Sequence, residues 1–264
     1  MSKTILITGS TDGIGLEAAK LLLAKGHTVL LHGRNPSKLE RVANSLSGLG
    51  TTESYIADLS DLSATRSMAE KIAQSHSTLD VLINNAGVYS LPNAKTPDGL
   101  NTVFKVNTVA PYLLTQTLLP IMPSNGRVIN LSSAAQSPVN LNALTGNVTL
   151  SDPFTTYAQS KLALTMWSIA LGQSHKESGP AIIAVNPGSM LGTKMVQNAF
   201  GVAGGDVGIG ADILARAAVS DEFKSASGKY YDNDARRFNS PHPDALNSSK
   251  SQEMVRTIES ILAK

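Results

Sequence analysis

The sequence contains no cysteine, and this absence excludes disulfide bonds, thiolate nucleophiles and cysteine-based zinc sites. Charge is also sparse, since 22 basic and 20 acidic residues make up only 16% of the chain and form no Lys/Arg-rich run. A nucleic-acid-binding surface needs concentrated basic charge, so we expect no nucleic-acid partner, and we expect no metal. A chain without cysteine is compatible with the reducing cytoplasm, which is the location we expect.

Long hydrophobic runs are absent too, and none approaches the ~20 apolar residues that a membrane-spanning helix needs. The chain passes from Met1 through the short apolar stretch Thr4–Ile7 into a glycine turn, which is not the pattern of a secretory signal peptide. The stretch Asn147-Val148-Thr149 fits the glycosylation sequon, but without secretion we interpret it as a polar loop. We therefore expect neither a membrane span nor a cleaved leader.

Apolar residues are plentiful, at 42% of 264 residues, and can fill the core of a single domain over residues 1–264. Short β-rich runs alternate with amphipathic stretches of helical length, such as Ile14–Lys25 and Pro36–Leu46. This alternation is typical of βαβ units. It predicts an α/β fold, a doubly wound, mostly parallel seven-stranded sheet flanked by helices. The strands are expected at Thr4–Thr8, Thr28–Leu31, Ser54–Ile56, Val81–Asn84, Val128–Leu131, Ile182–Val185 and Lys229–Tyr231.

Two segments do not fit the alternation. Residues 188–210 are rich in Gly, Ala and Met, a composition that suits a mobile substrate loop better than a core element. Residues 239–264 form a C-terminal tail that is polar and contains proline at first, and a short helix is predicted over Gln252–Leu262. There is no internal repeat and no low-complexity tract.

A glycine-rich turn lies where the first predicted strand passes into the first predicted helix. In that context glycines allow a tight turn, a close approach of backbone N–H groups to a pyrophosphate and close helix packing. A tight turn without a ligand would use the same residues, but the position between strand and helix favours dinucleotide binding. The turn reads Thr8-Gly9-Ser10-Thr11-Asp12-Gly13-Ile14-Gly15.

The end of the second predicted strand indicates which dinucleotide is bound. About 20 residues after the glycine turn, an Asp or Glu is expected if the ribose 2′-hydroxyl of NAD is recognised. Here Gly33 stands at that point and Arg34 follows, and a guanidinium can hold a 2′-phosphate by paired charge-assisted hydrogen bonds. The pattern predicts NADPH, with NADH the less favoured cofactor. Asp12 counts against this, because some NADPH enzymes have a second basic residue there, and Arg34 could be a solvated loop charge.

Tyr157 and Lys161 are four residues apart in the segment 155–171, whose apolar residues recur at helical spacing, so both side chains project from one face. A phenol with a pKa of about 10 is a poor base at neutral pH, and a nearby ammonium favours the phenolate. Lys161 is therefore expected to bring the pKa of Tyr157 towards the range of general acid–base catalysis. Taken alone, such a pair on a helix is more often structural.

Further motifs follow one another along the chain. They are Asp58-Leu59, Asn84-Asn85-Ala86-Gly87, Asn107, Ser132-Ser133, Tyr157-Ala158-Gln159-Ser160-Lys161 and Asn186-Pro187-Gly188. With the glycine turn, these motifs make the chain resemble the short-chain dehydrogenase/reductase family over nearly its whole length. The resemblance implies a Rossmann fold and hydride transfer between a nicotinamide and a carbonyl or alcohol carbon.

The resemblance also implies roles for single residues. Ser133 would hydrogen-bond the substrate oxygen, Tyr157 would exchange its proton, Lys161 would hold the nicotinamide ribose, and Asn107 would anchor a water in the proton relay. Ser133 is preferred to Ser132 because family members usually employ the second serine. Asp58 would meet the adenine, and Pro187-Gly188 with Thr193 would pack near the carboxamide. The implied cofactor-binding residues are Gly9, Thr11, Asp12, Gly13, Ile14, Gly15, Arg34, Asn35, Asp58, Leu59, Asn85, Ala86, Gly87, Tyr157, Lys161, Pro187, Gly188 and Thr193.

Other stretches resemble the retinol dehydrogenase and carbonyl reductase-like members of the family. These are Thr96-Pro97-Asp98-Gly99-Leu100, Tyr112-Leu113-Leu114-Thr115, Gln159 to Ala163 and Ser227-Gly228-Lys229-Tyr230-Tyr231. The expected partner is a small carbonyl or alcohol substrate of hydrophobic character. Phe154, Met190, Leu191, Met195 and Phe200 would suit such a pocket, although helix packing uses the same residue types. The stretch 136–156 is longer than in compact members, which leaves both a monomer and a homo-oligomer open.

Three alternatives differ from a carbonyl reductase. A serine hydrolase is disfavoured, because Ser133 lacks the Gly-x-Ser-x-Gly elbow and no sequence motif marks a histidine as its partner. A dinucleotide-binding regulatory protein would keep the groove without turnover, yet degenerate relatives generally lose the Tyr or the Lys, and both are present. A halohydrin dehalogenase-like lyase would replace the lysine and remodel the glycine turn, and neither change occurs here.

Overall fold

The structure is a computed structural model and describes residues 2–91 and 94–264. Within them, strands β1 to β7 pair in parallel and β8 pairs antiparallel with β7, in the order β3-β2-β1-β4-β5-β6-β7-β8. The direction of chain progress reverses between β1 and β4, and open α/β sheets bind ligands at the carboxyl ends of strands at such a point. The strands are β1 (Thr4–Ile7), β2 (Thr28–Gly33), β3 (Thr52–Ile56), β4 (Val81–Asn84), β5 (Arg127–Leu131), β6 (Ala181–Asn186), β7 (Tyr230–Asp232) and β8 (Arg237–Asn239).

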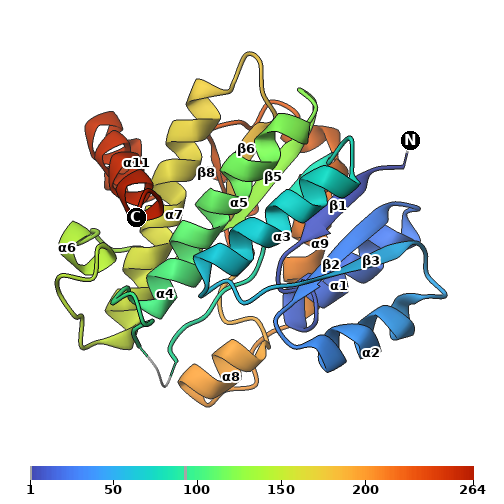
Figure 1. Ribbon diagram of the computed structural model, residues 1–264, viewed down its shortest axis with the longest axis horizontal. Coiled ribbons are helices and arrows are strands. Elements are labelled where there is room, and N and C mark those ends of the chain that lie inside the picture. Colours follow the sequence, from blue (N-terminus) through green and yellow to red (C-terminus); the bar gives the residue numbers. More distant parts are fainter. Residues whose placement is uncertain (1, 92–93) are drawn as a thin grey trace.

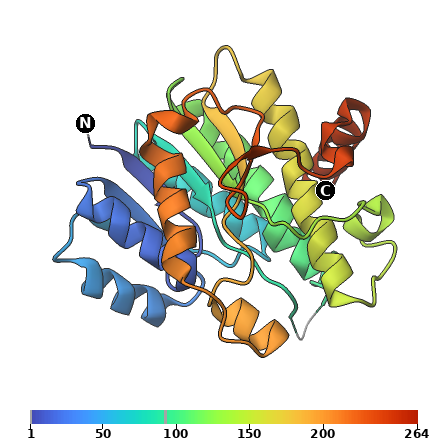
Figure 2. The ribbon, with the colours of Figure 1, turned by 180° about the vertical axis from the view of Figure 1, so that it is seen from behind.

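Helices cover both faces of the sheet, as the two opposite views show (Figures 1 and 2). One apolar core lies between the sheet and α3, α5 and α7, with α11 packed outside α7, and the other lies between the sheet and α1, α2 and α9. The helices are α1 (Gly13–Ala24), α2 (Pro36–Leu46), α3 (Leu62–Ser75), α4 (Thr102–Phe104), α5 (Ala110–Leu118), α6 (Leu141–Leu144), α7 (Pro153–Ser174), α8 (Lys194–Phe200), α9 (Val207–Val219), α10 (Pro243–Leu246) and α11 (Ser248–Leu262).

Local sequence explains why these elements form. Every residue of β4, β5 and β6 is buried, as expected of parallel strands that are covered on both faces. The longer helices start at residues whose side chains accept first-turn N–H groups, and each such cap stabilises a helix by roughly 1 kcal/mol. Asp12 caps α1, Asn35 caps α2, Asp61 caps α3 and Asp152 caps α7.

The predicted doubly wound sheet is confirmed, and it has one strand more than the sequence analysis expected. The additional strand, β8, has three residues and pairs as Tyr231 with Phe238 across a short turn. Its three residues are too few to show an alternating pattern in the sequence. In the turn before it, Arg236 adopts a positive φ of 54°. Strand β3 also starts at Thr52 rather than Ser54.

The two segments outside the predicted alternation contain helices. The segment 188–210 includes α8 and the first turn of α9. In the C-terminal segment the helix begins at Ser248, four residues before the predicted start, because the Asn247 side chain caps it. Its residues Met254, Ile258 and Ile261 are buried against the α7 side of the molecule. Among the described helices, none combines the length and the apolar character that a bilayer crossing requires.

Candidate active site

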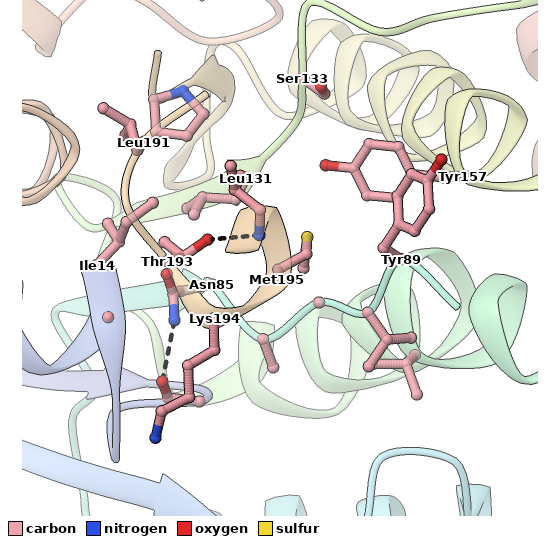
Figure 3. A pocket seen from close by; sticks show the side chains of 18 of the residues that line it. Ile14, Asn85, Tyr89, Leu131, Ser133, Tyr157, Leu191, Thr193, Lys194 and Met195 are labelled. Atoms are coloured by element: carbon pink, nitrogen blue, oxygen red, sulfur yellow. Dashed lines mark hydrogen bonds between the residues drawn. The ribbon is translucent and has the colours of Figure 1, made fainter. Parts of the chain in front are cut away.

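A cavity of about 620 Å³ opens at the carboxyl ends of the central strands (Figure 3). It brings together most of the residues that the sequence analysis assigned to catalysis and cofactor binding. Gly15, Asn35 and Asn107 are the assigned residues that do not line it. Those that do are Gly9, Thr11, Asp12, Gly13, Ile14, Arg34, Asp58, Leu59, Asn85, Ala86, Gly87, Ser133, Tyr157, Lys161, Pro187, Gly188 and Thr193.

The glycine turn between β1 and α1 forms a cradle that side chains would fill. Gly9 has a φ of +66°, and a Cβ built on it would lie 2.9 Å from the Cα of Ala86. A Cβ on Gly15 would lie 2.4 Å from the Asn85 amide nitrogen and 2.6 Å from the Gly9 carbonyl oxygen. Gly15 therefore lets α1 pack under the turn, and the N-terminus of α1 is left facing the cavity. A pyrophosphate fits such an N-terminus electrostatically.

The end of β2 supports the turn from beside it. Buried His32 accepts a hydrogen bond on Nδ1 from the Gly9 N–H at 3.0 Å, and its Nε2 lies 3.1 Å from the Ala57 carbonyl oxygen. Burial lowers the pKa of His32 to about 4, so the ring is neutral at pH 7 and its Nε2 donates to Ala57. A Cβ on Gly33 would lie 2.6 Å from Thr11 Cγ2, which shows how closely β2 approaches the turn.

Arg34 follows Gly33 and lines the cavity, whereas Asn35, which was also expected to bind the cofactor, does not line it. Asn35 Oδ1 accepts a hydrogen bond from the Lys38 backbone N–H at 2.9 Å and so caps α2. Its side-chain oxygen is therefore occupied in the structure. Asp12, by contrast, lines the cavity and forms ion pairs with Lys38 and Lys194.

The loops after β3 and β4 form the floor of the groove. Asp58 accepts hydrogen bonds from the N–H and the hydroxyl of Ser60, and these bonds and nearby Arg34 outweigh its partial burial and hold its pKa below the usual range. Asn85 donates from Nδ2 to the Thr8 carbonyl at 2.8 Å and to the Gly9 carbonyl at 3.2 Å. The Asn85 amide thus fastens the β4 loop to the glycine turn.

Tyr157 and Lys161 lie near the start of α7 and line the cavity, and Tyr157 faces it from the side away from Ile14 of the glycine turn (Figure 3). The Lys161 amine donates to the Leu131 carbonyl at 2.8 Å and lies 5.6 Å from the centre of the Tyr157 ring. A Cβ on Gly87 would lie 3.4 Å from this amine. The amine is therefore near both the phenol and the floor of the cofactor groove.

The pKa of Tyr157 shifts in the direction opposite to the expected one. Burial raises the pKa of Tyr157, and hydrogen bonding by Ser133 only partly opposes this. Burial also lowers the pKa of Lys161 to about 8. Lys161 is not among the causes of the Tyr157 shift, and its amine bonds to the Leu131 carbonyl. Tyr157 is held as a protonated acid.

The two serines after β5 have different surroundings. Ser132 is buried, and its hydroxyl lies 2.6 Å from that of Thr165 on α7. The hydroxyl of Ser133 accepts the Ala135 N–H at 3.1 Å and interacts with Tyr157. The Ser133 carbonyl accepts from Gln136 at 2.9 Å and from Tyr230 at 3.3 Å, which fixes its backbone. This arrangement favours Ser133 as the serine that meets a substrate oxygen.

Asn107 lies on a π-helical turn, Lys105–Val109, between α4 and α5. Its Oδ1 accepts from the Val88 N–H at 2.8 Å, and its Nδ2 donates to the Val88 carbonyl at 2.8 Å and to Ser160 Oγ at 3.0 Å. These bonds use both Nδ2 hydrogens and one of the two lone pairs of Oδ1. The role of Asn107 as the anchor of a water stays a prediction. Asn107 joins the β4 loop to α7, and single π-turns occur frequently at functional sites.

The segment after β6 closes over the glycine turn. Pro187 and Gly188 line the cavity, and the following Ser189 is held by Asp234, which accepts from both its N–H and its hydroxyl. Thr193 caps α8 and lies against the turn, since its Cγ2 would be 3.5 Å from a Cβ on Gly13. Thr193 also lines the cavity, and its place near the carboxamide stays a prediction.

The outer wall of the cavity is apolar and aromatic. The Tyr89 ring lies 5.4 Å from the Tyr157 ring (Figure 3) and 5.3 Å from the Phe200 ring of α8, so the three rings follow one another. Phe154 and Met195 line the cavity as well. Phe154 and Phe200 are 49% and 44% exposed, an arrangement that leaves apolar surface for a ligand.

Three residues of this region were not identified from the sequence. His32 sits directly before Gly33 in an otherwise apolar strand, and a polar residue in a buried strand was the available signal. Lys38 and Lys194 carried no signal, because Lys194 reaches Asp12 across 182 positions of sequence. Such pairing depends on how the segment after β6 folds back.

Comparison with known proteins gives a consistent result. The chain matches the short chain dehydrogenase family over residues 3–202. Retinol dehydrogenase 13 of Mus musculus is 32% identical over 266 residues, which covers 92% of this chain and 78% of that protein. Polyprenol dehydrogenase of Homo sapiens is 33% identical over 211 residues, which covers 75% of this chain and 63% of that protein.

Solved structures agree with the fold. An uncharacterized protein from Mycobacterium paratuberculosis superposes with a TM-score of 0.80 at 27% identity, covering 98% of this chain and 92% of that one. A short chain dehydrogenase from Shigella flexneri complexed with NADP superposes with a TM-score of 0.70 at 27% identity, covering 88% and 97% of the two chains.

Proposed function

The chain belongs to the short-chain dehydrogenase family and is an NAD(P)-dependent oxidoreductase of that type, and from this premise we propose that it reduces a ketone or aldehyde with NADPH. The reaction is reversible as the oxidation of an alcohol. The observation that carries the proposal is one cavity with two ends. A glycine cradle at a helix N-terminus forms one end, and Ser133, Tyr157 and Lys161 form the other.

The cavity residues suit the charge that develops during carbonyl reduction. A bound reduced nicotinamide supplies a hydride to the carbonyl carbon, and negative charge then grows on the oxygen. The hydroxyls of Ser133 and Tyr157 face one region and can donate hydrogen bonds to that oxygen. Because burial raises its pKa, Tyr157 is protonated at pH 7 and can give its proton to the oxygen.

Lys161 supports this proton transfer by its charge. Its pKa of about 8 leaves it mostly protonated at pH 7, so it favours the phenolate that remains when Tyr157 has given up its proton. Its amine also stands beside Gly87, where it can hold the sugar next to the nicotinamide. Asn107 acts through its bonds to Val88 and Ser160, which fix the groove floor relative to α7.

The cofactor choice rests on charge at the β2 end of the groove. Arg34 lines the cavity directly after Gly33, which stands where an NAD-specific protein would have a carboxylate. The similar Shigella flexneri protein was solved with NADP. Both observations support NADPH over NADH.

The substrate class follows from the outer wall. Tyr89, Phe154, Met195 and Phe200 present apolar surface beside Tyr157. The names of two relatives refer to retinol and polyprenol, which are apolar alcohols. We therefore propose an apolar carbonyl compound or the corresponding alcohol.

The proposal is tested by following NADPH and NADH oxidation with a panel of apolar and polar ketones and aldehydes. We expect turnover with NADPH and apolar carbonyls, and a loss of at least about 100-fold in kcat for Tyr157→Phe, since general acid catalysis typically contributes that much. Tyr112→Phe is the matched control, because it removes the same hydroxyl from a residue that bonds to Glu259 and does not line the cavity. Undiminished turnover in Tyr157→Phe would remove this residue from the mechanism, and tight NADPH binding without any turnover would favour a regulatory protein.

A further inference from the structure

The Asp12 carboxylate binds two lysines that come from different parts of the chain. Lys38 on α2 and Lys194 at the start of α8 place their amines 2.7 Å and 2.6 Å from the same oxygen, Oδ2. Asp12 also accepts the Gly13 N–H and caps α1. These contacts lower its pKa to about 2 although its partial burial acts in the opposite direction, so the carboxylate is ionised at every physiological pH. One carboxylate thus draws two ammonium groups to the edge of the glycine turn.

This cluster lies at the end of the groove where Arg34 stands. Thr11, the neighbour of Asp12, contacts Gly33, and Arg34 follows directly. Lys194 lines the cavity itself, and Lys38 reaches Asp12 from the α2 side. The end of the groove therefore carries three cations against the carboxylates of Asp12 and Asp58, an excess of one positive charge.

We propose that Lys38 and Lys194, gathered by Asp12, form together with Arg34 the site that recognises the 2′-phosphate of the cofactor. The inference rests on the proposed use of NADPH and names the residues that discriminate it from NADH. Each ammonium has three N–H donors, and the bond to Asp12 uses one. A phosphate ester, with a charge between about −1.5 and −2 at pH 7, offers acceptors for the remaining donors.

This arrangement also explains how Asp12, which stands where some NADPH enzymes have a basic residue, is compatible with NADPH binding. A lone carboxylate beside the 2′-phosphate would repel it, but one neutralised by two lysines leaves net positive charge. Lys194 belongs to the segment that closes over the glycine turn. By bonding to Asp12, Lys194 fastens this segment to the glycine turn. The same residue would also bind the 2′-phosphate.

The test measures binding of two fragments by calorimetry, 2′,5′-ADP, which carries the 2′-phosphate, and 5′-AMP, which lacks it. For Lys194→Met and for Lys38→Met we expect 2′,5′-ADP to bind about tenfold more weakly, since a charge-assisted hydrogen bond is lost. Binding of 5′-AMP should change less than about twofold. Lys250→Met is the control, because it removes a 2.6 Å ion pair between Lys250 on α11 and Asp244 on α10. Helix α11 is remote from α2 and α8 (Figure 1).

Two results would overturn the inference. One is 2′,5′-ADP affinity in both lysine variants equal to that of Lys250→Met. The other is an equal loss of affinity for 2′,5′-ADP and 5′-AMP, which would show a general effect on the groove. Lys194 is 72% exposed and Lys38 is 35% exposed, so both variants are expected to fold, and thermal unfolding checks this.

The fragment assay does not depend on catalysis. If no carbonyl compound is turned over but both lysine variants lose discrimination, the proposed reduction fails and the phosphate site stands. If NADPH-driven reduction occurs and the NADPH/NADH ratio of kcat/KM is the same in the variants and the wild type, the inference fails alone.

Discussion

Single residues of this site were predictable where a motif fixes them and unpredictable where the chain folding brings partners together. Tyr157 and Lys161 follow from helical spacing, and Arg34 follows from its place at the end of a strand. The direction of the Tyr157 pKa shift did not follow, because spacing gives the distance between two groups but not the water that burial removes. The His32 contact with Gly9 depends on how β2 lies beside the turn.

His32 makes the free energy of unfolding depend on pH in the acid range. Its folded-state pKa of about 4 lies below the unfolded value of 6.5, so the unfolded chain binds more protons between these values and stability falls as pH falls from about 6.5 to 4. The gap of 2.5 units corresponds to ~3 kcal/mol at the acid limit, of which about 2 kcal/mol is lost between pH 7 and pH 5.

Urea unfolding of wild type and His32→Gln at both pH values measures this effect. Glutamine does not titrate but keeps an acceptor that can face the Gly9 N–H. We expect the variant to lose about 2 kcal/mol less than the wild type between pH 7 and pH 5. Equal losses in the two proteins would show that His32 is not the titrating group.

At the scale of elements, the long periodic segments were predictable and the short ones were not. The helix predicted over Pro36–Leu46 has those bounds in the structure, because proline at its first position and the Asn35 cap define its start. Strand β8 was missed because three residues carry no usable alternation, and its pairing with β7 is set by the turn between them. The π-helical turn at Lys105–Val109 was missed too, since its cause is tertiary: Asn107 bonds to Val88 and Ser160.

The close packing at the junction of β1, the glycine turn and α1 predicts the effect of one substitution, Gly15→Ala, on stability and NADPH binding. In Gly15→Ala the new Cβ would meet the Asn85 amide at 2.4 Å and the Gly9 carbonyl at 2.6 Å, so the turn has to move away from α1. Overpacking of this kind costs about 1–3 kcal/mol. We expect NADPH binding to weaken by at least about tenfold, because the displaced N–H groups no longer converge on the pyrophosphate.

Gly48→Ala is the matched control for this prediction. A Cβ on Gly48 would meet no atom within 4 Å, and Gly48 has no positive φ. Calorimetric titration with NADPH and thermal unfolding compare the two variants. NADPH affinity in Gly15→Ala equal to that in Gly48→Ala would show that the close approach of α1 to the turn is not needed for binding.

For the whole molecule, the two apolar cores follow from the predicted layers, but the covering of α7 by the C-terminal helix did not. The polar composition of residues 239–251 pointed to a tail. In the structure α11 lies along α7 (Figure 1). Tyr112 on α5 donates to Glu259 of α11 at 2.9 Å. This bond and burial raise the pKa of Tyr112. The tail therefore completes the core on the side of the sheet that carries Tyr157 and Lys161.

This covering predicts that α11 contributes to global stability while the chemistry stays with α7. Ile258 is fully buried in the core that α7 shares, so Ile258→Ala should lower the free energy of unfolding by about 2–4 kcal/mol through lost burial and the cavity left behind. Leu246→Ala, at a residue that is 59% exposed on adjacent α10, should change it by less than about 0.5 kcal/mol. Both are measured by urea unfolding at pH 7.

Because neither Ile258 nor Leu246 lines the cavity, kcat of the folded variants should stay within about twofold of wild type. A stability loss below 1 kcal/mol for Ile258→Ala would mean that α11 is a detachable appendage, and a large fall in kcat would mean that its packing positions Tyr157.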